Sequence, residues 1–146
     1  MSEHSIKLKW ELGGAAFTYD AYPRNHTVTF KNRETVTMSA AAAYRGDAAL
    51  PDPEDMFVAS LSSCHMLSFL AIATKRKLSV VSYEDDAVGH LENNGGKLWM
   101  TKVILRPKIV FAGEADPALV TRCHDEAHHA CFIASSVKTD VTVDPV

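Results

Sequence analysis

Residues 52–77, which read DPEDMFVASLSSCHMLSFLAIATKRK, decide the fold. Asp52 suits the N-cap of a helix, and the proline after it suits the first helical position, where no hydrogen-bonded amide is required. Acidic residues follow at the start, and the basic run Lys75–Lys77 lies where the negative end of the helix dipole should be. These signals predict a helix over residues 52–76.

The interior of this helix carries no formal charge, because the nineteen residues of Met56–Thr74 include no Asp, Glu, Lys or Arg. His65 and five hydroxyl residues within it favour burial in protein rather than in lipid. The helix is apolar on nearly every side, and a chain of this length does not easily cover all of it. We therefore expect a second copy to cover part of it in a homodimer, with no membrane partner.

Short extended segments are predicted before this helix. Ile6–Leu12 alternates apolar and charged side chains, which is the period of a half-buried strand. Further strands are predicted at Phe17–Tyr22, Thr27–Lys31 and Thr35–Ser39, the last two forming a hairpin, and residues 40–51 form a surface connection. The first third of the chain is thus predicted to be a small antiparallel meander.

A long hairpin and a second helix are predicted after it. Leu78–Glu92 and Lys97–Phe111 are extended runs joined by Asn-Asn-Gly-Gly, a composition that favours positive φ and a tight turn. Asp116 and the proline after it open a second helix to about Ile133, and Val137–Val143 alternates as a final strand. The order βββαββαβ predicts one α+β domain over residues 1–146, with an antiparallel sheet and a central buried helix.

Composition narrows the functional class. The chain has 146 residues, 47% of them hydrophobic, which is enough for a core without a disulfide or a metal. Its net charge of −3 argues against nucleic acid as a partner. Charged residues stand where a secretory signal would be apolar, and the three cysteines are an odd number. We therefore expect a cytoplasmic protein whose cysteines are buried thiols, metal ligands or redox groups.

Two cysteines lie on the predicted helices, Cys64 inside the first and Cys131 near the end of the second. Ordinary buried thiols are one interpretation, because free cysteine is among the most buried residue types. A redox-active pair is another, whereas a permanent disulfide would conflict with a reducing compartment.

A metal site is a third interpretation. His124 and His128 share a helix face, and Cys123 and His129 are close in sequence, so zinc or copper binding is chemically open. The position of Glu126 midway between the two histidines does not match metalloprotease helices. We expect no functional metal and no cofactor.

One motif pair points to a known family. DPEDMFVASLSSC at residues 52–64 is followed some way along the chain by ACFIASSV at residues 130–137 and then by a Thr/Val strand. This arrangement resembles the OsmC/Ohr family of thiol-dependent hydroperoxide reductases over nearly the whole chain. Its most specific element is a Pro-Glu helix start ten residues before Cys64, paired with a second cysteine near the end of a later helix. The resemblance implies an OsmC-like fold and an intertwined homodimer with active sites at the interface.

The resemblance also implies roles for single residues. Cys64 would be the peroxidatic cysteine, Cys131 the resolving cysteine, and Glu54 the carboxylate that orients an essential arginine. Arg24 is most like the family's amino-terminal arginine, although the glycine-rich surroundings common in the hydroperoxide-resistance branch are missing. Arg33 and Arg45 are the alternatives. The family's pattern assigns no catalytic role to Cys123, His124, His128 or His129, and His65 after the cysteine suggests a side branch.

A cation near Cys64 is also expected on physical grounds, independently of the resemblance. Cys64 lies about three turns inside its helix, too far for much help from the helix dipole, and apolar surroundings raise the pKa of a thiol. A guanidinium would stabilise the thiolate and would donate to the peroxide oxygens in the transition state.

We therefore predict a thiol-dependent peroxidase. The Cys64 thiolate would reduce an organic hydroperoxide to an alcohol, and Cys131 would condense the resulting sulfenic acid into a disulfide. An external dithiol, either a small dithiol or a lipoylated protein, would then reduce that disulfide. The alternative is a non-catalytic module of the same fold that binds a small apolar ligand or a metal through its Cys/His cluster.

Overall fold

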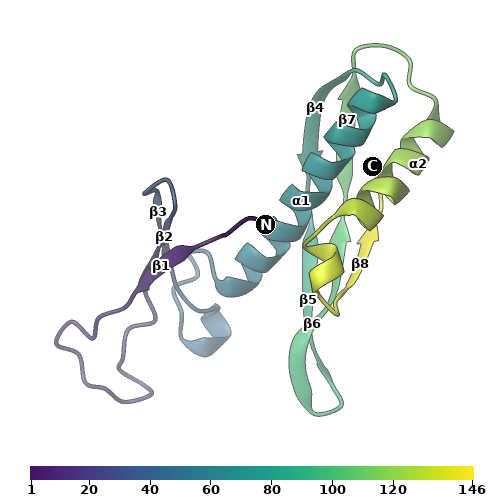
Figure 1. Cartoon of the computed structure of the whole chain (residues 1–146). Coiled ribbons are helices and arrows are strands. Elements are labelled where there is room, and N and C mark those ends of the chain that lie inside the picture. The colour runs from purple at the N-terminus through teal and green to yellow at the C-terminus, as the bar shows by residue number, and fades with distance from the viewer. The chain divides into compact units, whose positions relative to one another are not determined.

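The computed structural model describes residues 1–146 and contains two α-helices, two short 3-10 helices and eight strands (Figure 1). The predicted α+β class is confirmed. The chain forms two compact units, Met1–Met56 and Phe57–Val146, and each is described by itself.

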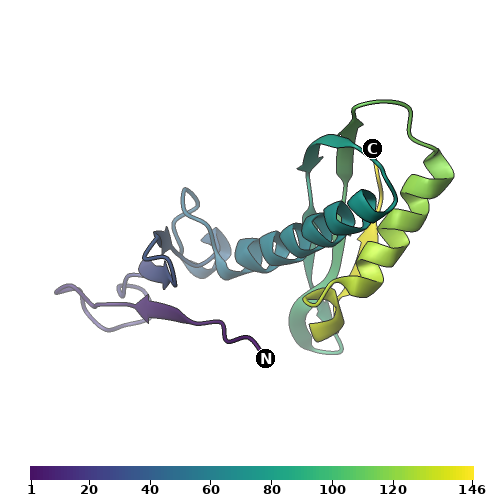
Figure 2. The ribbon, with the colours of Figure 1, turned by 45° about the horizontal axis from the view of Figure 1, so that its top comes forward.

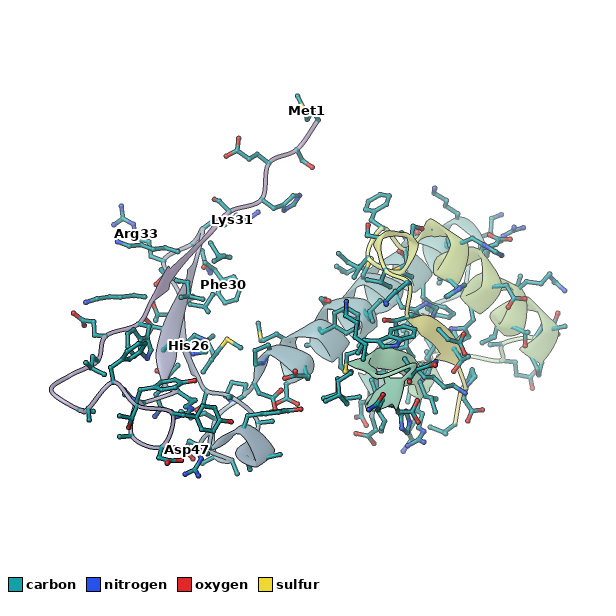
Figure 3. All side chains as sticks on the ribbon, turned by 90° about the horizontal axis from the view of Figure 1, so that it is seen from below. Met1, His26, Phe30, Lys31, Arg33 and Asp47 are labelled. Carbon is teal, nitrogen blue, oxygen red and sulfur yellow. The ribbon has the colours of Figure 1, made fainter.

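The first unit is built on a three-stranded antiparallel sheet. Its strands, in spatial order, are β1 (Ile6–Lys9), β2 (His26–Phe30) and β3 (Thr35–Met38). Figure 3 shows Arg33 at the turn of the β2–β3 hairpin and His26 at its other end. The hairpin predicted between residues 27 and 39 is therefore confirmed.

Two details of the predicted meander are wrong. Residues 17–22 form turns rather than a strand, because the amides of Ala21 and Tyr22 donate to the carbonyl of Thr18 at 3.1 and 3.0 Å. The first strand ends at Lys9, and all four of its side chains are exposed although they alternate in polarity. β1 is an edge strand, and alternation alone does not bury one of its faces.

The connection before the long helix is tight and contains one turn of 3-10 helix, η1 (Ala42–Tyr44). A Cβ atom at Gly46 would lie 1.5 Å from the carbonyl oxygen of Ala40, so only glycine fits there. Ser39 is fully buried, and its hydroxyl donates to the side-chain oxygen of Asn25 at 2.8 Å. The same hydroxyl accepts from the backbone N–H of Asp47 at 3.0 Å. These bonds fix the connection against the strands.

The long helix α1 (Pro53–Lys75) confirms the prediction for residues 52–76 to within one residue at each end. Asp52 and Asp55 cap it reciprocally, because the N–H of each donates to the carboxylate of the other, at 3.1 and 2.9 Å. Beyond its last turn, Lys77 takes a φ of 61°, the left-handed conformation that commonly closes a helix.

One stripe of α1 is buried. Its fully buried residues are Leu61, His65, Phe69 and Ala73, spaced four apart on one helix face. Elsewhere apolar side chains stay uncovered, and Leu67 is 60% exposed. By length and composition alone α1 could also cross a membrane, a test that the core helix of a globular protein passes equally well. Within one chain, the central helix is therefore covered on one face only.

The two long strands predicted after α1 are each interrupted. Arg106 donates its backbone N–H to the Asp85 carboxylate at 2.6 Å, and Pro107 has no N–H to offer a strand ladder. The halves beside the turn pair with each other as the predicted hairpin. The halves farther from the turn form a separate two-stranded sheet. The four strands are β4 (Val80–Asp85), β5 (Val88–Asn94), β6 (Lys97–Leu105) and β7 (Pro107–Phe111), with β5 paired to β6 and β4 to β7.

The second helix, α2 (Pro117–Ala130), begins as predicted, since the Asp116 side chain accepts from the N–H of Ala118 at 3.0 Å. It ends before the predicted Ile133, because Cys131 is already extended. After it come η2 (Ala134–Ser136) and β8 (Asp140–Val143), which is shorter than the predicted Val137–Val143. β8 pairs parallel with β6, not antiparallel, because the crossover through α2 returns the chain in the same direction.

Both helices lie on the same face of the strands in the second unit (Figures 1 and 2). One core cluster joins Leu61 of α1 to Val103 of β6. The other joins Phe69 of α1 to Cys123 and Ala127 of α2. Packing along these two clusters holds the middle of α1 beside α2, which is where the two candidate cysteines lie.

Candidate active site

The structure brings Cys64 and Cys131 together. Cys64 points from the middle of α1 and is half-buried, whereas Cys131 directly follows α2 and is 1% exposed. Both are free thiols, and Cys64 lies close enough to Cys131 to contribute to the raised pKa of the Cys131 thiol. Two residues far apart in the sequence thus form a contact from which a disulfide can form once one sulfur is oxidised.

The surroundings of Cys131 keep its thiol protonated. Burial raises the pKa of Cys131, and its hydrogen bond and charge interaction with Cys64 raise this pKa further. The backbone N–H groups of Ala134 and Ile133 oppose this shift, and the N–H of Ala134 lies 3.4 Å from the Cys131 sulfur. Cys131 is therefore the less exposed thiol of the pair and one that ionises poorly at neutral pH.

Arg24 lies in the first unit, just before β2. Its guanidinium donates to the carbonyl oxygens of Tyr22 and Tyr19, both at 2.6 Å, and its Cζ atom lies 3.6 Å from the centre of the Tyr22 ring. Its Nε atom is buried and has no hydrogen-bond partner. The side chain is thus fixed by its own loop, with one donor left over.

The other predicted charged residues are less constrained. Arg33 is exposed at the β2–β3 turn, and Arg45 is exposed and pairs with Asp20 at 2.7 Å. Glu54 is half-buried in the first turn of α1 and, within the first unit, forms no ion pair with Arg24. The first unit alone therefore does not show the carboxylate–arginine pair that the resemblance implies.

A buried histidine pair links the two helices, and sequence analysis did not predict it. His65 Nε2 lies 3.0 Å from His124 Nδ1, and the planes of the two rings are nearly parallel, at an angle of 4°. The other ring nitrogens, His65 Nδ1 and His124 Nε2, are buried without partners. The available signal was the four-residue stripe of α1 that places His65 between Leu61 and Phe69 on the buried face.

Both imidazoles are neutral near pH 7. Burial lowers the pKa of His65 to about 4, and the neighbouring His124 and His128 contribute to the same shift. Burial also lowers the pKa of His124 to about 4, although the carboxylate of Asp125 opposes it. One ring must therefore donate its N–H to the lone pair of the other.

The histidines and cysteines considered as metal ligands do not gather at one place in the structure. No group of three or more His, Cys, Asp or Glu side chains is placed to hold a metal ion. Cys123 is fully buried in the apolar cluster with Phe69, and burial raises the pKa of its thiol. His128 and His129 line an open hollow of about 440 Å³ between α2 and β8. The metal-binding interpretation thus has no support from the geometry.

The fold and the site together define an α+β protein in which a half-buried cysteine on a long helix contacts a second, buried cysteine. The family model described as OsmC-like protein matches residues 46–146. The chain belongs to the OsmC-like family.

Solved structures agree with this assignment. An OsmC-like protein of unknown function from Vibrio cholerae shares 44% sequence identity, with a TM-score of 0.93 and 100% of each chain covered. An organic hydroperoxide resistance protein OsmC from Legionella pneumophila shares 16%, with a TM-score of 0.71, covering 99% of this chain and 97% of its own. An organic hydroperoxide resistance protein from Elizabethkingia anophelis also shares 16%, with a TM-score of 0.70, covering 99% and 95%. The last two show similarity of fold. A search of curated proteins gave no match.

Proposed function

We propose that the protein is a thiol-dependent peroxidase that reduces organic hydroperoxides at Cys64. The contact between Cys64 and Cys131 carries the proposal, because a sulfenic acid at Cys64 would have a second thiol within reach. Membership of the OsmC-like family, whose fold is shared by organic hydroperoxide resistance proteins, supports it.

The reaction has three steps. The Cys64 thiolate attacks the distal oxygen of the hydroperoxide, the O–O bond breaks, and the alkoxide takes a proton and leaves as an alcohol. Cys131, as it loses its proton, attacks the sulfenic sulfur of Cys64 and water leaves, which forms the disulfide. An external dithiol, either small or carried on a lipoylated protein, returns both cysteines to thiols and is itself oxidised to a disulfide.

The difference between the two thiols supports this order. Cys131 is almost completely buried, and burial raises its pKa, so its thiolate is scarce and a peroxide has poor access to it. Cys64 is half-buried. An oxidant from solvent therefore meets Cys64 first, and Cys131 is suited to the second, intramolecular step.

Arg24 is the cation that we propose for the site, with Glu54 as the carboxylate that orients it. The Arg24 guanidinium is already immobilised by two carbonyls and an aromatic ring, so little entropy is lost when it receives an anion. Its Nε–H is a buried donor without a partner, and such a donor suits a thiolate or a carboxylate.

We also propose that the protein is a cytoplasmic homodimer. The uncovered apolar face of α1, with Leu67 60% exposed, supports an interface with a second copy. We propose no nucleic-acid partner, because acidic residues outnumber basic ones in the sequence.

Consumption of an alkyl hydroperoxide with dithiothreitol or dihydrolipoamide as reductant tests the reaction. Cys64→Ser should abolish turnover, and Cys131→Ser should permit one turnover and then trap an oxidised Cys64. Cys123→Ala is the matched control, because this thiol is buried elsewhere in the core, and it should keep turnover. Full turnover by Cys64→Ser would show that the nucleophile is wrong, and no consumption by the wild type would favour the binding-module alternative.

The second-order rate of Cys64 oxidation tests Arg24 and Glu54. Arg24→Lys should be almost as slow as Arg24→Ala, because an ammonium does not reproduce the planar fork. Glu54→Gln should slow oxidation as well and leave the fold intact by circular dichroism. Arg33→Lys is the control, being exposed at a distant turn of the same unit. Near wild-type rates in Arg24→Lys and Glu54→Gln would remove both residues from the mechanism.

A further inference from the structure

The sulfur of Cys131 is surrounded by backbone donors. The chain turns after α2, the N–H of Ala134 bonds to this sulfur at 3.4 Å, and the N–H of Ile133 lies near enough to help lower the pKa of the thiol. Backbone N–H groups fixed in a turn are ready to receive negative charge without reorganising. These two donors therefore stabilise the Cys131 sulfur most when it is a thiolate.

Cys64 has no comparable donors from its own helix. It lies far from both ends of α1 (Pro53–Lys75), where each backbone N–H donates to the carbonyl four residues earlier. Neighbouring amides of α1 are thus already engaged and do not bond to the Cys64 sulfur. Cys64 is, however, the more exposed of the two cysteines.

We propose that reduction of the Cys64–Cys131 disulfide has a fixed direction, in which the reductant attacks Cys64 and Cys131 leaves as a thiolate held by the N–H groups of Ile133 and Ala134. This inference rests on the proposed function, since it concerns the disulfide formed in that reaction. It assigns a catalytic role to two backbone amides of the turn that follows α2.

The geometry of thiol–disulfide exchange gives the first reason. An attacking thiolate approaches a disulfide along the S–S axis, from the side opposite the leaving sulfur. Attack at Cys131 would require entry through the core beyond a side chain that is 1% exposed. Attack at Cys64 requires only the access that this half-buried side chain already has.

The departing charge gives the second reason. As the new S–S bond forms between the reductant and Cys64, the old one breaks and its electron pair goes to the Cys131 sulfur. The two backbone donors oppose the cost of placing this charge in a buried site. The second thiol of the dithiol then attacks the mixed disulfide, leaves with the reductant as a closed disulfide, and releases the Cys64 thiolate. Cys131 takes its proton from solvent.

Mapping the first mixed disulfide tests the direction. The experiment uses Cys123→Ala protein, which retains only the two reacting cysteines. The disulfide is formed with diamide, and the protein is then exposed briefly to 2-mercaptoethanol. The reaction is quenched with acid and N-ethylmaleimide, and the protein is digested for mass spectrometry. We expect the adduct on Cys64 to exceed that on Cys131 by roughly tenfold or more at the earliest times. Equal adducts, or an excess on Cys131, would overturn the proposal. Because diamide forms the disulfide without a peroxide, this result is independent of whether the protein is a peroxidase.

A proline variant tests the backbone donors. Ala134→Pro removes one N–H from the Cys131 sulfur and should slow reduction of the disulfide by roughly tenfold, with the adduct still on Cys64. In Cys64→Ser protein the same change should raise the pKa of Cys131, measured by the thiolate absorbance, which loss of packing alone does not predict. The control Ser136→Ala lies in the same turn and keeps both N–H donors. An Ala134→Pro protein that is folded by circular dichroism and is reduced at the wild-type rate would exclude the amide role.

Discussion

The buried histidine pair should make the stability of the protein fall steeply between pH 6.5 and pH 4. His65 and His124 both have a pKa of about 4 in the folded protein, against 6.5 for an ordinary histidine. Between these values the unfolded chain binds more protons than the folded one, so acid favours unfolding. The stability contributed by the neutral pair is fully present above pH 6.5 and is lost as the pH falls through 4.

The size of the effect follows from the pKa difference. At pH 5, one histidine with these two pKa values costs about 2 kcal/mol of stability relative to neutral pH, and the full difference is about 3 kcal/mol per ring. Both rings are at most 4% exposed, so solvent does not screen them.

The test compares the wild type with His65→Leu/His124→Leu, in which both partners become apolar and neither can ionise. Replacing both histidines should change the stability at pH 7.5 little. Replacing only one should cost about 1–3 kcal/mol, because the remaining buried ring loses the hydrogen-bond partner of one nitrogen. Urea unfolding followed by circular dichroism, at fixed ionic strength and protein concentration, gives the stability at each pH. The exposed His129→Gln is the control, and it should keep the wild-type slope.

Two outcomes would refute this argument. If the double leucine variant lost stability with acid as steeply as the wild type, the slope would come from other groups. If the imidazole Cε1–H resonances of His65 and His124 titrated near pH 6.5 in the folded protein, the rings would not be held neutral by burial.

Three other substitutions have expected outcomes. Gly46→Ala should destabilise the first unit by roughly 3 kcal/mol or more in thermal unfolding, because its Cβ would overlap the Ala40 carbonyl, whereas Gly113→Ala, with nothing within 4 Å, should change little. Lys77→Gly should raise stability by about 0.5–1 kcal/mol, since its φ of 61° favours glycine, and an unchanged or lower melting temperature would contradict this. Light scattering should give about twice 16.0 kDa for the wild type and less for Leu67→Glu, and a wild-type monomer would exclude the dimer.

Local signals predicted α1 almost completely. Its signals are the N-cap and proline at residues 52–53 and the basic run at its end. Each acts within one turn of the helix, so its effect can be predicted from the sequence alone. The structure shows the expected cap as a reciprocal bond pair between Asp52 and Asp55. The start of α2 at Asp116 was predictable for the same reason.

Contacts between distant residues explain where the prediction failed. The break between β6 and β7 depends on the bond from Arg106 to Asp85, two residues whose positions relative to each other follow from the pairing of β4 with β7. Residues 17–22 have the composition of a strand, but their amides turn back to Thr18 because no neighbouring strand pairs with them. Neither outcome can be read from periodicity in one segment.

The residues of the candidate site also differ in how far the sequence predicts their surroundings. The pairing of Cys64 with Cys131 came from the family resemblance, since on the residues alone buried thiols or metal ligands were equally open. The packing of α1 against α2 explains why the two cysteines lie near each other. Arg24 was chosen because it is most like the family's amino-terminal arginine, and its side chain is held by neutral groups, the carbonyls of Tyr19 and Tyr22. A guanidinium held in this way has its orientation fixed before any anion arrives. The orphan Nε–H, rather than the charge alone, is therefore the feature that distinguishes Arg24 from the exposed arginines of the same unit.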